Sequence, residues 1–268
     1  MAVPYKAPVK DIVFGYEVID SYNVLNKISA FSDFSEDIVI PTMEECAKFS
    51  EEVLAPINAI GDQQGATIKD GVVTMPEEFV DAYQKFAEAG WASISLPSDI
   101  GGGGMPITLS GGTLEILSTA NLAFGLAPGL SAGAISAINF HGSQEQKDKF
   151  LPKLVSGEWT GTMNLSEPQS GSDLGTITTK AEPQEDGSYK ITGTKVWITF
   201  GEHNMTENII HLVLAKVPGS PEGTKGISMF IVPKYTVNDD GSVGDSNNVS
   251  CISIEEKLGI HASPTCVM

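Results

Sequence analysis

The sequence predicts an α+β protein in which an all-helical N-terminal domain precedes an antiparallel β-barrel or β-sandwich domain. Two observations support this: apolar residues recur with a helical period in the first part, and the period changes to two from Trp159 onward. A third is size, because 268 residues with 41% hydrophobic content can form two modest cores. We therefore divide the chain into an N-terminal arm (1–34), a helical domain (35–158) and a β domain (159–268).

The first predicted helix of the helical domain covers Ser35 to Asn58 and is amphipathic. Pro41 interrupts its early part, because proline has no N–H and its ring collides with the preceding helical turn. A later helix is marked at its start by Ser143 and Gln146, the two partners of a capping box. Its apolar face is formed by Phe150, Leu151 and Leu154.

Thr74-Met75-Pro76-Glu77 predicts another helix start, with a capping box and a proline at the first helical position. Gly90 predicts the end of this helix. Its apolar face is formed by Phe79, Tyr83, Phe86 and Ala87.

The stretch from Ile116 to Phe140 contains no charged residue. Several small polar residues lower its apolar density, and Pro128-Gly129 divides it, so it predicts a pair of buried helices and not a membrane span. The glycine run Gly101 to Gly104 lacks the spacing of a phosphate loop, and it predicts a tight turn between helices.

The second half has the alternating pattern of short strands joined by loops rich in glycine, proline and aspartate. Asp186-Gly187 predicts a hairpin turn, whereas Pro218 to Gly226 and Asn238 to Asn248 predict surface loops. The predicted strands are Thr176 to Ala181, Tyr189 to Thr199, Asn208 to Lys216, Ile227 to Val232 and Val249 to Ile254.

The charge of the chain excludes nucleic acid as a partner. The net charge is −18, and none of the 16 basic residues is an arginine, so the usual bidentate phosphate contact is missing. An anionic ligand has to be held by backbone N–H groups, hydroxyls or a few lysines.

The cysteines and histidines show no metal-ligand spacing, and we predict no metal site. The three cysteines, Cys46, Cys251 and Cys266, fit no disulfide framework and predict a reducing, cytoplasmic environment. The first residues form no signal peptide, and no GxSxG, HExxH or CxxC motif supports hydrolase or zinc chemistry. The four histidines, His141, His203, His211 and His261, are dispersed, and we expect surface or hydrogen-bonded core positions for them.

Two segments of the β domain combine residue types that suit a planar heterocyclic ligand. In the first, GTMNLSEPQSGSDLGTITTK (Gly161 to Lys180), glycines and hydroxyls surround one Glu-Pro pair. In the second, Lys195 to Thr199, Trp197 and Thr199 are two residues apart and share one strand face. This pair offers an apolar wall for a ring and a donor for a ring nitrogen.

Ser166 to Asp173 (SEPQSGSD) and Trp197-Ile198-Thr199 resemble the paired signatures of the acyl-CoA dehydrogenase family of flavoenzymes. The resemblance spans essentially the whole chain. It is strongest to the subgroup that includes 3-methylmercaptopropionyl-CoA dehydrogenase, through GEWTGTMNLSEPQSGSDLG, VWITFGEHNMTENIIHLVLAK and GTKGISMFIVPK.

The resemblance implies that the first segment cradles FAD and that Trp197 packs on the flavin ring. Thr199 donates toward flavin N5, Gly171 and Ser172 lie near the pyrophosphate, and Ser172 also lies near the acyl-CoA. The cofactor-binding residues it implies are Met163, Leu165, Ser166, Gly171, Ser172, Trp197, Ile198 and Thr199. The uncharged helices are then expected to wall the acyl chain.

The activity implied is the introduction of an α,β double bond into an acyl-CoA, such as 3-methylmercaptopropionyl-CoA or another short or medium acyl-CoA. A glutamate takes the α-proton, the flavin takes the hydride, and electron transfer flavoprotein accepts the electrons. In the family this glutamate belongs to a C-terminal helical domain that also builds homo-oligomers, and that domain is not found here. Glu255 and Glu256 are poor substitutes at a strand end, so we expect the chain alone to be an inactive front part.

Two residues depart from the family pattern: Ser166 replaces a threonine but keeps its hydroxyl, and His261 replaces an arginine, which weakens any phosphate or interface role there. Two alternatives stay open at this point. One is acyl-CoA oxidase chemistry, in which oxygen reoxidises the flavin. The other is a non-catalytic fragment that binds flavin or acyl-CoA.

Overall fold

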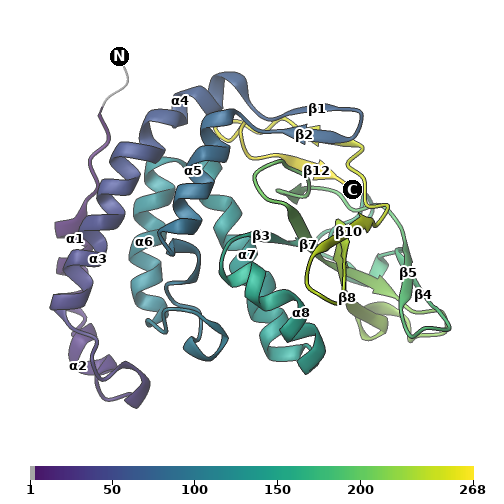
Figure 1. Cartoon of the computed structure of the whole chain (residues 1–268), viewed down its shortest axis with the longest axis horizontal. Helices are drawn as coiled ribbons and strands as arrows, with labels where there is room; N and C mark the ends of the chain where they lie inside the picture. The colour runs from purple at the N-terminus through teal and green to yellow at the C-terminus, as the bar shows by residue number, and fades with distance from the viewer. Residues whose placement is uncertain (1–3) are drawn as a thin grey trace.

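The computed structural model describes residues 4–268 and places a layer of helices beside a β domain (Figure 1). The eight α-helices of this part of the chain are α1 (Val9–Val18), α2 (Ser21–Leu25), α3 (Glu36–Phe49), α4 (Ala55–Gln64), α5 (Glu77–Glu88), α6 (Ile107–Ala120), α7 (Leu122–His141) and α8 (Gln144–Val155). The strands are β1 (Thr67–Lys69), β2 (Val72–Thr74), β3 (Trp159–Asn164), β4 (Lys180–Pro183), β5 (Tyr189–Thr192), β6 (Ile198–Thr199), β7 (Asn208–Lys216), β8 (Ile227–Pro233), β9 (Tyr235–Val237), β10 (Val243–Ser246), β11 (Ser253–Glu255) and β12 (Thr265–Val267). The predicted α+β class is confirmed.

The helical core is built around aromatic rings from α5 and α7. Phe79, Phe86 and Phe124 are almost completely buried, and the rings of Phe86 and Phe124 meet edge to face with centroids 5.6 Å apart. The predicted apolar face of α5 therefore points into this core. Gly90 adopts a positive φ of 75° directly after the helix and ends it as predicted.

The predicted interruption at Pro41 is wrong, because α3 runs through it and a π-helical turn (Ser50–Leu54) joins α3 to α4. Pro41 removes the hydrogen bond that its N–H would donate to Asp37, but the flanking residues Val39 and Met43 are fully buried. Core packing on both sides therefore outweighs one missing backbone bond.

The capping box predicted at Thr74 is also wrong. Thr74 ends β2 and pairs with Thr67, so Pro76 takes the cap position of α5 without a side-chain cap bond. The unpredicted hairpin β1–β2 turns at Asp70-Gly71, both with positive φ. The second predicted box is confirmed, because Gln146 N donates to Ser143 Oγ and Ser143 N donates to Gln146 Oε1.

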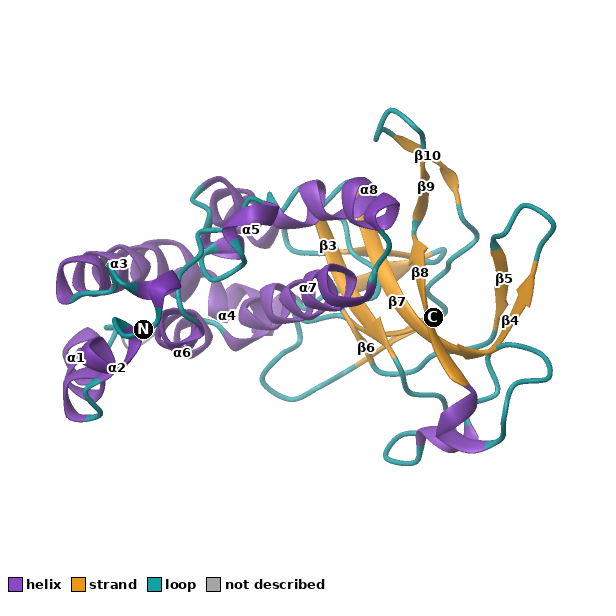
Figure 2. Ribbon diagram, turned by 90° about the horizontal axis from the view of Figure 1, so that it is seen from below, coloured by secondary structure: helices purple, strands orange, loops and turns teal. Residues whose placement is uncertain are grey.

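The uncharged stretch forms parts of two helices, but they meet at Asn121 and not at Pro128, which lies inside α7. Asn121 caps α7 by accepting from Phe124 N at 3.1 Å, and its amide donates to the carbonyl of Leu54 at 3.2 Å. Within residues 4–268, α7 is long and apolar enough to cross a membrane by length and composition. It packs on β3 and α6 (Figure 2), so its apolar side is buried in contacts with the rest of the protein.

The main sheet has the strand order β3-β7-β4-β5, and β8 pairs with the other edge of β7. Most pairs are antiparallel, as predicted, but β3 runs parallel to β7 along six residues. Helices α7 and α8 lie against this sheet (Figure 2). A close approach makes this packing possible, since Gly161 of β3 leaves room for Ala134 and its N–H donates to Ser131 Oγ at 3.0 Å.

A smaller sheet, β11-β12-β6, brings the chain end beside the second predicted segment. The strand predicted over Tyr189 to Thr199 divides into β5 and β6, and the loop predicted over Asn238 to Asn248 contains β10. The turn at Gly187 and the strand at Asn208–Lys216 match the prediction.

The glycine run of the helical domain also forms a turn, in which a side chain on Gly102 would collide with the Leu96 carbonyl.

Candidate functional site

The first predicted segment continues from the end of β3 into a tight turn. Met163 lies on β3 and packs against the core of the sheet, and Leu165 and Ser166 follow as half-buried residues. Glu167 and Ser170 then exchange two backbone hydrogen bonds of 2.8 and 2.9 Å. The chain therefore reverses its direction immediately after Ser166, and the backbone of this turn lies at the surface.

After this turn, the segment continues with two exposed small residues, Gly171 and Ser172. An added Cβ on Gly171 would meet no atom within 4 Å, so the space in front of this residue is open. The fold itself does not require a glycine there. A ligand that approaches the backbone closely would require it.

The turn is held from inside by the buried carboxylate of Glu167, whose side chain is 2% exposed. Its two oxygens accept hydrogen bonds from the backbone N–H and hydroxyl groups of Thr178 and Thr179, from Lys195 Nζ and from Gln169 Nε2, at distances of 2.5 to 3.0 Å. Burial alone would raise the pKa of Glu167, but the donors from Thr179, Thr178 and Lys195 outweigh burial and hold the pKa well below its usual range. Glu167 is thus a structural anion, ionised across the physiological pH range.

The second predicted segment presents Trp197 at the surface. Trp197 has a positive φ of 60° and is 52% exposed, Ile198 is 2% exposed, and Thr199 is half-buried. Burial therefore alternates, with Trp197 and Thr199 on the open side and Ile198 in the core. An exposed indole in a left-handed conformation is unusual in a fold without a ligand or partner for it.

A backbone hydrogen bond joins the two segments, from Val196 N to the Ser166 carbonyl at 2.9 Å. It brings Ser166 next to the residue that precedes Trp197. Within residues 4–268, the side-chain hydroxyls of Ser166, Ser172 and Thr199 make no hydrogen bond. An open aromatic ring and free hydroxyls at a bend of the backbone fit a flavin ring and its polar edge.

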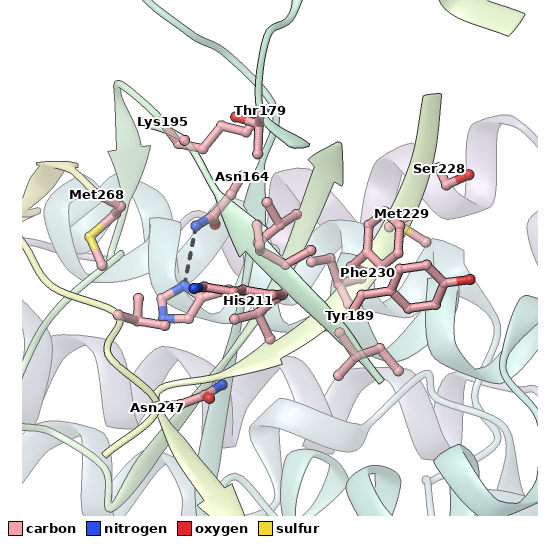
Figure 3. Close-up of a pocket in the computed structure, with 18 of the residues that line it drawn as sticks. Asn164, Thr179, Tyr189, Lys195, His211, Ser228, Met229, Phe230, Asn247 and Met268 are labelled. Carbon is pink, nitrogen blue, oxygen red and sulfur yellow. Dashed lines mark hydrogen bonds between the residues drawn. The ribbon is translucent and has the colours of Figure 1, made fainter. Parts of the chain in front are cut away.

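The β domain also has a hollow outside the candidate site. A cavity of about 1160 Å³ opens between β5, β7, β8 and residues 247–252, and none of the predicted flavin residues lines it. Lys195 and Thr179 line it near each other, and the Asn164 amide points toward the His211 ring (Figure 3). The cavity and the candidate site therefore share only the residues that hold the Glu167 turn.

Two histidines lie buried and stay neutral, His211 on β7 and His203 in the loop that precedes β7. His203 Nδ1 accepts from Met205 N at 3.2 Å and its Nε2 bonds Thr160 Oγ1 at 2.9 Å, whereas His211 Nδ1 bonds Thr162 Oγ1 at 2.8 Å. Burial, aided by the positive charge of Lys234, lowers the pKa of each imidazole to about 3. The prediction of hydrogen-bonded core positions holds for these two residues.

Neither Glu255 nor Glu256 lies at the candidate site as a buried base. Glu255 pairs with Thr265, which pairs with Thr199, so Glu255 is two strands away from Thr199, and its side chain is exposed. Glu256 lies 3.7 Å from His261. His261 also bonds the Asp62 carbonyl at 2.8 Å, so two acidic residues flank it, an unfavourable setting for a phosphate.

Sequence reasoning missed the residues that support the site from below. Thr178 and Thr179 follow Glu167 by 11 and 12 residues within the first segment, Lys195 follows it by 28 in the second, and the fold brings all three to its carboxylate. A sequence signal did exist: Glu167 follows a buried strand, and a carboxylate in that position requires several donors.

Family models of the acyl-CoA dehydrogenase N-terminal domain and middle domain match residues 41–158 and 162–268. A 3-methylmercaptopropionyl-CoA dehydrogenase of Ruegeria pomeroyi is 45% identical over 98% of this chain and 45% of its own length. A butyryl-CoA dehydrogenase of Syntrophomonas wolfei is 39% identical over 97% of this chain and 43% of its own length. The chain therefore spans less than half the length of these relatives.

A solved structure, an acyl-CoA dehydrogenase complexed with FAD from Bacillus anthracis, has the same fold over most of the chain. Its TM-score is 0.68 and its sequence is 27% identical, with coverage of 88% of this chain and 35% of that chain. The likeness covers both the helical layer and the β domain in which the two segments lie.

Proposed function

Because the chain belongs to the acyl-CoA dehydrogenase family, we propose that it is the N-terminal and middle part of an FAD-dependent enzyme that introduces an α,β double bond into an acyl-CoA thioester. The observation that carries this proposal is the pairing of an open Trp197 ring with free hydroxyls on Ser166 and Thr199, across the Val196–Ser166 hydrogen bond. Bound there, FAD would supply the acceptor for the hydride that leaves the β-carbon.

The residues of this chain hold and orient the ring. Trp197 offers its exposed face for stacking, and Thr199, the last residue of β6, directs a hydroxyl toward a ring nitrogen. Ser166 lies beside the ring edge, and Gly171 lets a phosphate group come close to backbone N–H groups. These donors take the place of arginine, which the chain lacks.

Proton abstraction from the α-carbon needs a carboxylate close to both substrate and flavin. Within residues 4–268, Glu167 cannot serve as this base, because both of its carboxylate oxygens already accept hydrogen bonds from neighbouring residues. Glu255 cannot serve either, because it lies two strands from Thr199. We therefore propose that the base is supplied from outside these residues. We expect no turnover when the chain is mixed with butyryl-CoA and an artificial electron acceptor, and clear turnover would contradict this.

The substrate and partners are proposed at the level of chemical class. Similarity to the 3-methylmercaptopropionyl-CoA and butyryl-CoA dehydrogenases favours a short or medium acyl chain, with α6 and α7 as its wall and Ser172 near the thioester. We propose electron transfer flavoprotein as the electron acceptor, and a homo-oligomer for the full-length enzyme. The three cysteines are free and buried in the structure, which suits the proposed reducing, cytoplasmic setting.

The test is a visible absorbance spectrum of the purified chain after FAD has been added and the excess removed. We expect a retained flavin band with quenched tryptophan fluorescence. Trp197→Ala should lose the band, while circular dichroism of the variant stays unchanged because the indole is 52% exposed. A flavin-free spectrum from folded protein would contradict the proposal for this chain.

Experiments on the full-length enzyme separate the dehydrogenase from the two alternatives. Oxygen consumption by the full-length enzyme with acyl-CoA would indicate an oxidase. Flavin retention without turnover in the full-length enzyme would indicate a binding protein.

A further inference from the structure

The two flavin-facing segments come from different strands, and one buried side chain bonds the first segment from within the second. We propose that Lys195 is a positioning residue: its ammonium ties the Leu165 carbonyl to the Glu167 carboxylate and so sets where Ser166 and Trp197 stand relative to each other. This inference rests on the proposed function. It adds a role for a residue that itself touches no ligand.

The hydrogen bonds of Lys195 reach the residue before Ser166 and the residue after it. Lys195 Nζ donates to Leu165 O at 3.0 Å and to Glu167 Oε1 at 2.9 Å, and its side chain is 4% exposed. These two acceptors flank Ser166 on both sides. The ammonium therefore fixes the backbone on one side of Ser166 and a side chain on the other.

The main chain of Lys195 is held equally firmly. Its N–H and carbonyl exchange two hydrogen bonds of 2.8 Å with Met268, at the end of β12. The next residue, Val196, donates to Ser166, and Trp197 follows with a positive φ. The backbone of Lys195 is fixed within the second segment, and its ammonium is bonded to the first. Lys195 therefore fixes the distance between the two segments.

Charge neutralisation alone does not explain this geometry. Glu167 already receives four donors from Thr178 and Thr179, so its carboxylate would remain solvated by the protein without Lys195. The bond to the Leu165 carbonyl adds nothing to the neutralisation of Glu167. It satisfies a second N–H of the buried ammonium and, in doing so, fixes the backbone before Ser166.

The test measures FAD affinity by flavin fluorescence titration of the chain and its variants. Lys195→Met keeps the length of the side chain and removes its charge and both bonds, and we expect FAD binding about 10- to 100-fold weaker. The matched control is Lys234→Met, which breaks another buried ion pair, Lys234–Glu202 at 2.5 Å, without contacting either segment. We expect this control to bind FAD within about threefold of the parent chain, because its lost bonds lie away from the ring.

A double-mutant cycle with Glu167→Gln tests the coupling. The combined loss in Lys195→Met/Glu167→Gln should be smaller than the product of the single losses, because both changes break the same bond. Equal FAD affinity of Lys195→Met and the parent chain would overturn the inference.

Amide hydrogen exchange provides a readout that does not need flavin. In Lys195→Met the Val196 amide should exchange at least about tenfold faster, while the Ile210 amide in the centre of β7 keeps its protection. If the parent chain binds no FAD, the proposed function fails for this chain, and the exchange result still decides the inference: faster exchange at Val196 alone supports it. Unchanged exchange there, or a uniform loss at both amides, contradicts it.

Discussion

Acidification from pH 6.5 to 4.5 should destabilise the folded chain through His203 and His211. Each has a pKa of about 3 in the fold, mainly because burial disfavours the charged ring, against 6.5 in the unfolded chain. A group whose folded pKa is depressed stabilises the fold above the unfolded pKa, and that stability is lost as the pH falls toward the folded pKa. The loss therefore starts near pH 6.5.

The size of the effect follows from these pKa values. Each pH unit well below the unfolded pKa lowers the free energy of unfolding by about 1.4 kcal/mol per histidine. At pH 6.5 each ring is already half protonated in the unfolded chain. Acidification to pH 4.5 therefore removes about 2 kcal/mol per histidine and about 4 kcal/mol for the two together. The structure supports the direction independently, because Met205 N donates to His203 Nδ1, and a protonated Nδ1 would face that N–H. Burial raises the pKa of Glu202, which opposes part of the loss.

The assay is urea unfolding followed by tryptophan fluorescence at several pH values, for the parent chain and for His203→Asn. The variant removes one titrating ring, so the fall in unfolding free energy between pH 6.5 and 4.5 should shrink by about 2 kcal/mol. Histidine ring signals in NMR provide a second measurement. Titration of the His203 or His211 ring near pH 6.5 in the folded chain, assigned by its loss in His203→Asn or His211→Asn, would refute the reasoning, and so would a pH-independent stability.

Three further substitutions test the packing and the site. Gly161→Ala should lower the free energy of unfolding by about 1 to 3 kcal/mol in urea, because the new Cβ would overlap Ala134 at the contact between α7 and β3; full stability would show that this contact can relax. Asn121→Ala should cost about 1 to 3 kcal/mol in the same assay, since it removes the cap of α7 and the bond to Leu54; an unchanged urea midpoint would contradict this role. Thr199→Val should leave the melting temperature unchanged but shift the absorbance of added FAD, because the hydroxyl makes no bond within residues 4–268; an unshifted spectrum would remove Thr199 from the site.

Periodic patterns in the sequence predicted some elements at their observed limits, whereas the strands predicted over Thr176 to Ala181 and Val249 to Ile254 are displaced to β4 and β11. Alternation predicted β7 at its observed limits, and the Ser143–Gln146 pair predicted the start of α8, because both signals depend on neighbours within a few residues. Local rules failed at Pro41 and Pro128, where both helices continue. Burial of the surrounding residues in a common core is a long-range effect that a proline penalty does not include.

The candidate site shows the same division. The sequence by itself determined the chemistry offered to a ligand: an indole, hydroxyls and glycines in two segments, and no arginine. Only the tertiary structure decided that Ser166 and Val196 meet, that Trp197 stays open, and that Lys195, Thr178 and Thr179 converge on Glu167. Residue type and spacing are local properties of the chain, whereas the partners of a buried charge are set by strand order and register, which depend on contacts between distant residues.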